Sequence, residues 1–320
     1  MASQQAIRFS ICIPAYKSQH LQACIQSILD QTVEDFELIL LNDRSPQPVE
    51  EVVKGFSDPR IRYFCNEKNV GAYHLVQNWN KCMDLSQGEY LVIMGDDDLL
   101  EPNYLEEFLR LIERYPDLNV YHCRSQIIDE EGNTHLLTPS CPSFETVYDS
   151  IWHRLNQLRS NYISDYVYRR EALIKQGGFY DLPLAWGSDD ITAFIASAER
   201  GIAHSNEPVF KYRSHGMSIS STTSNGLVKL EADLGYENWL ENFLQTPPES
   251  SRNSVIYSHL HRQQKQYMKQ RKLYSITKIL ASQAIPNPLP WLKEREKFHL
   301  TARDIFVASI KSRALRNKNH

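Results

Sequence analysis

Strands and helices alternate along the first third of the sequence, and this alternation constrains the fold more than any other feature. Short apolar runs, typical of buried strands, are separated by segments with apolar residues at helical spacing, such as Leu21, Cys24, Ile25 and Ile28. Strands are predicted at residues 7–14, 36–43, 61–66 and 90–94, and helices at 20–31, 75–88 and 102–115. Such a chain is expected to form an α/β domain with a mostly parallel central sheet flanked by helices.

Polar residues follow three of the predicted strands where each strand ends. The segments are Pro14-Ala15-Tyr16, Asn42-Asp43 and Asp96-Asp97-Asp98. Ligands of such sheets bind beyond the carboxyl ends of the strands, so the fold is expected to gather these segments at one edge. Three adjacent carboxylates repel one another, and a divalent cation among them would offset the repulsion. An acidic turn without a metal is the alternative, since Asp favours turns.

The chain is predicted to divide near residue 225, after a loop rich in Ser, Gly and Asn. Residues 1–225 form the α/β domain in this interpretation, and residues 226–320 form a helical, basic C-terminal region. The net charge of the whole chain is −4, but residues 252–320 hold 15 Lys and Arg against three acidic residues, a net charge of +12. That leaves −16 for residues 1–251 and suggests that the basic region meets something anionic.

The C-terminal region also carries apolar residues that can share one helix face. They are Leu300, Ile305, Phe306, Ile310 and Leu315, with Arg303, Lys311, Arg313 and Arg316 around them. This pattern predicts a helix lying on an anionic membrane surface. Two alternatives remain open, because the same face can pack on the acidic domain or form a homodimer. Nucleic acid is disfavoured as a partner by the acidic body of the chain.

Other features exclude several classes of protein. No stretch approaches the roughly 18 consecutive apolar residues of a membrane-spanning helix. The first ten residues lack the pattern of a signal peptide. The six cysteines show no C-x-x-C pair, which favours reduced thiols over disulfides or a zinc site. Together these features predict a cytoplasmic protein, with peripheral attachment to the inner face of the membrane if the C-terminal helix binds lipid.

Five segments in order resemble those of family 2 glycosyltransferases. They are SICIPAYKS, QTVEDFELILLNDRS, NVGAYHLVQNWNKCMDLSQGEYLVIMGDDDLLEP, WGSDD and YRSHGMSIS. The resemblance covers about residues 7–220. It implies the GT-A fold, a Rossmann-like α/β fold that binds nucleotide sugars, and an inverting transfer of a sugar. Such a transfer needs a cation to stabilise the leaving diphosphate and a carboxylate to accept the acceptor's proton.

The resemblance implies a metal site and a catalytic base. Asp97 matches the metal-binding aspartate of the family's D-x-D motif, and the ion would be Mn2+ or Mg2+. The first aspartate of that motif falls on Gly95 here, so Asp96 or Asp98 must supply the second carboxylate. His215 resembles a loop histidine that reaches the metal or the diphosphate. The carboxylate pair Asp189 and Asp190 matches the base, with Asp189 in the family's position, and a helix N-cap is the alternative role for either.

The remaining site residues would bind the nucleotide sugar. Tyr16, after Pro14 and Ala15, looks like the residue that stacks on the base, and Asp43 like the one that hydrogen-bonds it. Asn69 opens the third resembling segment, and Asn80 matches a helix asparagine near the diphosphate.

These residues imply a glycosyltransferase that uses a nucleoside-diphosphate sugar, with a UDP-sugar favoured. The expected acceptor is a hydroxyl of a glycan or lipid-linked saccharide in cell-surface polysaccharide biosynthesis. A non-catalytic module that binds nucleotide sugars is the main alternative, because Gly95 departs from the motif. A nucleotidyltransferase is disfavoured because no Gly-rich, lysine-bearing loop follows the first strand.

Overall fold

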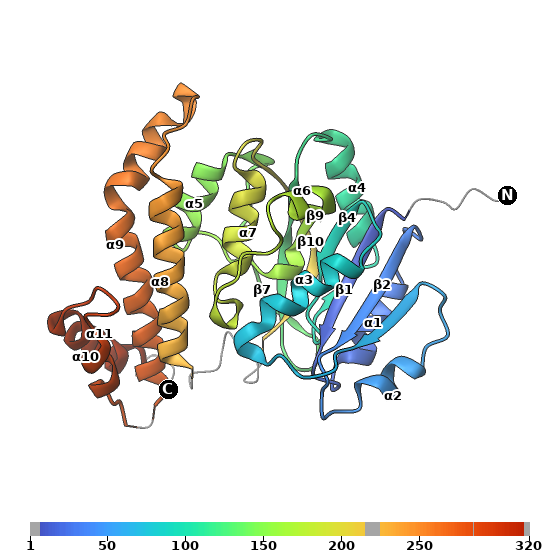
Figure 1. Ribbon diagram of the computed structural model, residues 1–320, viewed down its shortest axis with the longest axis horizontal. Helices are drawn as coiled ribbons and strands as arrows, with labels where there is room; N and C mark the ends of the chain where they lie inside the picture. The colour runs from blue at the N-terminus through green and yellow to red at the C-terminus, as the bar shows by residue number, and fades with distance from the viewer. Residues whose placement is uncertain (1–6, 215–224, 284, 317–320) are drawn as a thin grey trace.

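One mixed sheet with helices on both faces forms the centre of the molecule (Figure 1). The computed structural model describes residues 7–214, 225–283 and 285–316. The strands are β1 (Phe9–Ala15), β2 (Phe36–Asn42), β3 (Ile61–Cys65), β4 (Tyr90–Ile93), β5 (Leu99–Leu100), β6 (Val120–Ile128), β7 (Thr134–Leu137), β8 (Phe144–Glu145), β9 (Tyr166–Arg169) and β10 (Ile202–Arg213). Their order is β3-β2-β1-β4-β9-β6-β10-β5, and β7 and β8 pair with β6 and β10.

Helices cover both faces of this sheet, and the C-terminal helices α8 to α11 extend the molecule to one side (Figure 1). They are α1 (Leu21–Leu29), α2 (Val49–Lys54), α3 (Leu75–Leu85), α4 (Tyr104–Arg114), α5 (Val147–Leu155), α6 (Arg170–Lys175), α7 (Ser188–Ser197), α8 (Gly226–Phe243), α9 (Ser251–Ser282), α10 (Leu289–Glu294) and α11 (Ala302–Arg316). Short 3-10 turns are η1 (Ala72–His74), η2 (Ile163–Asp165) and η3 (Pro183–Ala185). The α/β fold class predicted from the alternating pattern is confirmed.

The four strands predicted in the first third are parallel neighbours in the order β3-β2-β1-β4. Alternate side chains of β1 enter separate cores. Ile11 and Ile13 pack in the core that includes α1 and α4, and Cys12 packs in the core on the α3 face. This two-sided burial explains why β1, β2 and β4 are near-continuous apolar runs, whereas the edge strand β3 is only half-buried. Because the strands are parallel, their carboxyl ends open on the same edge.

The other half of the sheet mixes directions, which the sequence did not indicate. Strand β9 is antiparallel to both β4 and β6, whereas β10 runs parallel to β6. The β10 strand begins at Ile202, before the PVFKYR segment that reads as a strand in the sequence, and its pairing with β6 shifts register between Ser205 and Phe210. The edge strands β5, β7 and β8 are too short to leave a periodic pattern.

The C-terminal helices share a core with the α/β domain. An apolar cluster that includes Ile151 of α5, Phe194 of α7, Tyr236 of α8 and Leu260 of α9 joins the four helices, which lie side by side in Figure 1. The division near residue 225 stays a prediction, but the region beyond it is packed on the rest of the chain. Of the three alternatives for the basic region, docking on its own domain therefore applies to α8 and α9.

Helix α11 does not present the single apolar face expected from the sequence. Leu300 and Ile305 are buried against α8, α9 and α10, whereas Phe306 is 65% exposed and Ile310 is 52% exposed. Leu315 is half-buried. The prediction that these residues form one apolar face is therefore wrong, because α11 packs on α9 through the side that carries Ile305. No helix within the described ranges combines the length and apolar character needed to cross a membrane.

Candidate functional site

A cavity of about 920 Å3 opens at the carboxyl ends of the parallel strands. Of the residues predicted from the sequence, those in its lining are Pro14, Tyr16, Asp43, Asn69, Asp96, Asp97, Asp98 and Asp189. Ala15, Asn80 and Asp190 are not in the lining. His215 lies outside the described residues. The expectation that three strand ends and a distant carboxylate meet at one edge therefore matches the geometry.

The aspartates after β4 surround the ammonium group of a lysine. Lys17 pairs with Asp97, and its Nζ lies 3.5 Å from Asp96 Oδ1. The second oxygen of Asp96 accepts hydrogen bonds from the backbone N–H groups of Tyr16 and Lys17 at 2.8 and 2.6 Å. Burial lowers the pKa of Lys17, but the Asp96 and Asp97 carboxylates outweigh it and the net shift is upward. Lys17 is therefore a cation held against two carboxylates.

Asp98 occupies the space that a side chain at residue 95 would need. A Cβ atom on Gly95 would lie 2.5 Å from Asp98 Oδ2 and 3.4 Å from Asp97 Oδ1. The other oxygen, Asp98 Oδ1, accepts a 2.8 Å hydrogen bond from the backbone of Arg213. The Arg213 side chain donates to the Asp97 carbonyl. Residue 95 offers no carboxylate, and the Asp98 carboxylate lies beside Asp97 in the space that a side chain at residue 95 would need.

These carboxylates fit a hard divalent cation. Burial raises the pKa of Asp96, and burial with the neighbouring Asp97 carboxylate raises that of Asp98 well above its usual range. A bound cation would favour the ionised form of both carboxyl groups and so oppose these upward shifts. Carboxylate oxygens are the ligands that Mg2+ and Mn2+ prefer.

Asp43 holds together the part of the cavity wall after β2. Its Oδ1 accepts hydrogen bonds from Asn66 Nδ2 at 2.8 Å and from the Val70 backbone at 3.0 Å. Its carbonyl accepts from Asn69 Nδ2 at 2.7 Å. Asp43 and Asn69 thereby tie the β2 end to the segment before α3. Nearby, the ring of Tyr16 is 44% exposed, so one face of an aromatic ring is available at the mouth of the cavity.

Asn80 bonds to the backbone of a neighbouring loop. Its Oδ1 accepts a 2.8 Å hydrogen bond from the Phe179 backbone, and its Nδ2 lies 3.5 Å from the Phe179 carbonyl oxygen. The loop approaches closely because Gly178 has a φ of +92°, and a Cβ there would lie 2.4 Å from Asn80 Oδ1. In this structure Asn80 positions the loop after α6, so its expected contact with a diphosphate finds no support in the geometry.

The two aspartates at the start of α7 have different surroundings. Asp190 is fully buried, and its oxygens accept hydrogen bonds from Arg154 Nε at 2.7 and 2.9 Å. Asp189 is partly exposed and lines the cavity. The N-cap of α7 is Gly187, with no side-chain capping bond, so the alternative role of either aspartate as an N-cap is wrong.

The surroundings of Asp189 raise the pKa of its carboxyl group. Its pKa is raised to about 7, chiefly by burial and then by the Asp190 carboxylate, while the Arg154 guanidinium opposes the shift. A carboxylate with such a pKa is about half ionised at neutral pH, and its ionised form takes a proton far more readily than an ordinary carboxylate does.

Helix α9 completes the cavity wall with cations. Arg271 and Lys278 line the cavity, and Arg271 donates a 2.7 Å hydrogen bond to Asp233 of α8. Its guanidinium also lies 3.8 Å from Asp190. Trp186, just before α7, donates to the same Asp233 at 3.2 Å. The C-terminal helices therefore support the segment that carries Asp189.

Five basic residues that line this site were missed in the sequence analysis, namely Lys17, Arg154, Arg213, Arg271 and Lys278. Lys17 and Arg213 lie within two of the resembling segments, but the short spacing of a motif does not show which neighbouring side chain turns inward. Arg154, Arg271 and Lys278 lie outside every resembling segment. No local signal identifies them, because they reach the cavity from α5 and α9.

Comparison with known proteins places the chain in a family. The family model described as "Glycosyl transferase family 2" matches residues 10–179, which is more than half of the chain. The chain belongs to glycosyl transferase family 2. The model's span ends before α7, so the match includes the aspartates after β4 and excludes Asp189.

A family 2 relative is the putative colanic acid biosynthesis glycosyl transferase WcaA of Escherichia coli. It is 30% identical over 139 residues, which cover 41% of this chain and 49% of the relative. The chain spans less than half the length of the first relatives it matches.

Solved structures share the GT-A fold of this family 2 chain. TarS 1–349 of S. aureus, in complex with UDP-GlcNAc, has a TM-score of 0.66 at 14% identity and covers 97% of this chain and 92% of its own. The mannosyltransferase PcManGT of Pyrobaculum calidifontis, in complex with GDP-Man and Mn2+, has a TM-score of 0.54 at 12% identity and covers 97% and 86%. At such identities the likeness shows the fold alone.

Proposed function

We propose that this chain is a metal-dependent, inverting glycosyltransferase. It moves a sugar from a nucleoside-diphosphate sugar, with a UDP-sugar favoured, to a hydroxyl of a glycan or lipid-linked acceptor. The observation that carries the proposal is one cavity lined both by the aspartates after β4 and by Asp189, whose pKa is raised to about 7. A leaving diphosphate and an acceptor hydroxyl need these two kinds of carboxylate site at once.

In this proposal Asp97 and Asp98 hold the cation. Each has an oxygen facing residue 95, and Asp96 is already committed to two backbone N–H groups through one oxygen. A bound Mn2+ or Mg2+ would stabilise the negative charge that develops on the leaving diphosphate. If a cation took the place of Lys17 beside Asp97, the Lys17 ammonium group, which also lines the cavity, could bind a phosphate oxygen of the donor instead.

Asp189 acts as the base. The acceptor oxygen forms a bond to the anomeric carbon as the bond from that carbon to the diphosphate breaks. The hydroxyl proton moves to Asp189, and attack from the face opposite the diphosphate inverts the anomeric centre. Burial raises the pKa of Asp189, and the neighbouring Asp190 carboxylate raises it further while the Arg154 guanidinium opposes the shift.

The nucleoside would lie between Tyr16 and Asp43. A half-exposed ring offers a stacking surface, and a buried aspartate next to it offers an acceptor for a base N–H. TarS was crystallised with UDP-GlcNAc and PcManGT with GDP-Man, so the fold itself accommodates either base. The relative WcaA, by its name, supports a role in polysaccharide biosynthesis.

Slow hydrolysis of the donor tests this proposal. With Mn2+ and no acceptor, the full chain is expected to release nucleoside diphosphate from a UDP-sugar faster than from GDP- or dTDP-sugars. Thermal shift with the same panel measures binding separately, because a ligand of the native state raises the melting temperature. Binding without release from any donor would favour the alternative, a non-catalytic module. Release in excess chelator would contradict the metal requirement.

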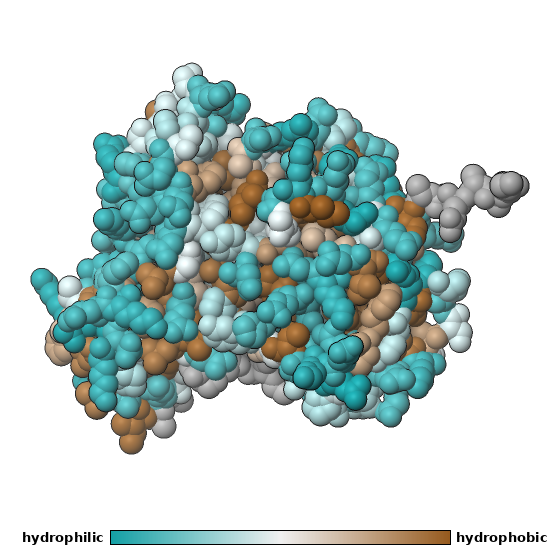
Figure 2. Space-filling model, viewed as in Figure 1, coloured by the Kyte–Doolittle hydropathy of each residue, from teal (hydrophilic) through white to brown (hydrophobic). Residues whose placement is uncertain are grey.

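We also propose peripheral membrane association through the outer face of α11. Phe306 and Ile310 are exposed there, with exposed Arg303 and Lys311 on the same helix. Figure 2 shows apolar groups at the lower left of the molecule, in the region of α10 and α11. Apolar contact with lipid and cation contact with anionic headgroups, about 1 kcal/mol per Lys or Arg, would add together.

Flotation with vesicles that contain phosphatidylserine checks the membrane proposal. The full chain is expected to float at low salt and to be released at high salt. The double substitution of Phe306 and Ile310 by Ser should lose at least half of the floating fraction. Val255→Ser on α9, where the side chain is 80% exposed, is the matched control and should float normally. Equal flotation of both variants, or none of the wild type, would contradict the proposal.

A further inference from the structure

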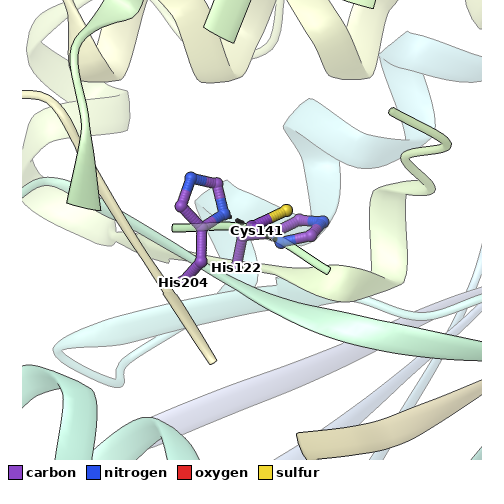
Figure 3. A group of neighbouring side chains, drawn as sticks. All are labelled: His122, Cys141 and His204. Atoms are coloured by element: carbon purple, nitrogen blue, oxygen red, sulfur yellow. Dashed lines mark hydrogen bonds between the residues drawn. The ribbon is translucent and has the colours of Figure 1, made fainter. Parts of the chain in front are cut away.

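Two histidines and a cysteine meet inside the molecule at a place that the proposed reaction does not use. His122 of β6 and His204 of β10 are cross-strand neighbours in the parallel pairing, and Cys141 comes from the segment between β7 and β8 (Figure 3). One ligand atom from each lies within 4.8 Å of the others, and all three residues are buried. None of the three lines the cavity at the carboxyl ends of the parallel strands, which is called the donor cavity below.

The spacing of the two rings suits a shared metal ion. His122 Nδ1 lies 3.1 Å from His204 Nδ1. Two imidazole nitrogens bound at 2.0–2.1 Å to a tetrahedral ion are separated by about 3.4 Å, from the tetrahedral angle and that bond length. The rings are inclined at 72°, so their lone pairs need not oppose one another along a single line. Small movements would place both nitrogens on one ion.

A carboxylate stands behind each ring. His204 Nε2 lies 3.2 Å from Glu145 Oε1, and His122 Nε2 lies 3.5 Å from Asp165 Oδ2. Neither nitrogen meets hydrogen-bond geometry within the described part of the chain. Metal-bound histidines commonly direct the nitrogen that does not bind the metal toward a carboxylate, which fixes the ring and its tautomer. Each ring thus has a carboxylate near the nitrogen that would not bind the ion, which is where metal-bound histidines commonly have one.

When both rings are neutral and both carboxylates are ionised, the cluster has one hydrogen too few for its contacts. Three contacts run in series, from Asp165 to His122, from His122 to His204, and from His204 to Glu145. With two neutral imidazoles and two ionised carboxylates the cluster holds two hydrogens for three contacts, so one further proton or a cation must fill the third contact. An ion between the Nδ1 atoms removes the conflict, because each Nε2–H then faces a carboxylate.

The charges of the surroundings also call for a divalent cation. Glu145 and Asp165 are buried, and Arg159 is 3.4 Å from Glu145. Glu145, Asp165 and Arg159 together carry a net charge of −1, so a divalent ion bound with a Cys141 thiolate would bring the total charge of the cluster to zero. Buried charge without compensation is costly, and a divalent ion would neutralise it.

Cys141 is held in position by its own backbone. Asn206 accepts a hydrogen bond from the Cys141 N–H at 2.8 Å and donates one to the Cys141 carbonyl at 2.9 Å. These paired bonds anchor the segment before β8 to β10. The sulfur is thus fixed near the rings by contacts that do not involve the sulfur itself.

We propose that His122, Cys141 and His204 bind a zinc-type divalent ion, with water as the fourth ligand. Nitrogen and thiolate donors suit Zn2+ and Co2+, whereas Mn2+ and Mg2+ prefer the oxygens of the donor cavity. The ion fastens the segment around Cys141 to β6 and β10 and is structural. The absence of a C-x-x-C pair, which disfavours zinc in the sequence, does not apply to ligands contributed by strands far apart in the chain.

Cobalt spectroscopy of the full chain tests the site. After treatment with a chelator, one equivalent of Co2+ is expected to produce a thiolate-to-cobalt charge-transfer band and to be displaced by one equivalent of Zn2+. Carboxylates cannot produce this band, so binding in the donor cavity does not interfere. Absence of the band in the folded wild-type chain would overturn the proposal, whatever the variants do.

Matched variants assign the ligands. Cys141→Ser is expected to lose the band, while Cys65→Ser, the same change at an exposed thiol, retains it. Glu145→Gln should keep the band but weaken Zn2+ binding by roughly 10- to 100-fold, the usual effect of removing a partner of a metal-bound histidine. Zinc content by mass spectrometry should be highest in the wild type and in Cys65→Ser, lower in Glu145→Gln and lowest in Cys141→Ser. A band that persists in Cys141→Ser and disappears in Cys65→Ser would mean that cobalt binds a surface thiol, and would equally overturn the site.

Discussion

Asp189→Asn is expected to lower turnover by roughly 100-fold or more, the usual scale for loss of a general base, and to leave donor affinity nearly unchanged. Asn keeps the shape of the side chain but cannot accept the proton of the acceptor hydroxyl. The measurement is transfer to acceptor under saturating donor, with donor affinity taken from thermal shift. If donor affinity fell in parallel with turnover, Asp189 would be a binding residue and the base would lie elsewhere.

The pH dependence gives a second test of the same residue. Since the base must be ionised and the pKa of Asp189 is raised to about 7, kcat/KM is expected to fall as pH drops below about 7. An ordinary aspartate would keep its activity down to about pH 4. Asp189→Asn should abolish this acid limb along with most of the activity.

Asp190→Asn is the matched control. It removes the neighbouring negative charge and releases Arg154, and both changes lower the pKa of Asp189. The acid limb of kcat/KM should therefore move to lower pH, while turnover at higher pH is largely kept in the folded fraction. If Asp190→Asn instead gave the large loss and Asp189→Asn did not, the assignment of the base would be wrong by one residue.

Asp97→Ala is expected to lower turnover by roughly 1,000-fold or more, because a cation contributes several kcal/mol to stabilising the leaving group. The variant should also lose the increase in donor affinity that Mn2+ gives to the wild type. Comparing donor-induced thermal shifts with Mn2+ and with chelator measures that increase directly. Asp84→Ala, at an exposed aspartate on α3, is the control for loss of a carboxylate.

Lys17 provides the competing explanation, since its ammonium already pairs with Asp97. If Lys17 itself stabilises the diphosphate in place of an ion, the wild type will work in excess chelator and Lys17→Met will be inactive. Under the metal hypothesis, chelator stops the wild type, and Lys17→Met binds Mn2+ more tightly without donor because a competing cation is gone.

The sequence predicted the half of the fold in which each strand is buried on both faces. β1, β2 and β4 are apolar runs followed by helices with a clear apolar stripe, as at Leu21 and Cys24. Strand β9 was missed because it lies in an irregular stretch and pairs antiparallel with β4 and β6, so its place depends on distant partners. The spacing of apolar residues within one segment does not show which distant strands that segment pairs with.

The candidate site divides in the same way. Residues directly after parallel strands, such as Asp43 and Asp97, could be placed at one edge from topology alone. The environment of Asp189 could not, because it depends on Arg154 from α5 and on the degree of burial. The apolar face of the last helix was misjudged for a related reason: the pattern showed apolar residues, but only packing on α9 decides that Ile305 is inside and Ile310 is outside.

Arg271 and Lys278 line the cavity and lie on α9, which follows every strand of the sheet in the sequence. The cavity wall is therefore completed late in synthesis. Chains emerge from the ribosome with their N-terminal parts first, and these begin to fold while the rest is still being made. The strands β1–β4 and the aspartates after β4 are then available before α9 exists. A chain interrupted before α9 would keep much of the sheet but lack this basic wall and the contacts of Asp233 with Trp186 and Arg271. Incomplete products are thus not expected to consume sugar nucleotide, which confines donor use to molecules whose last helices have docked.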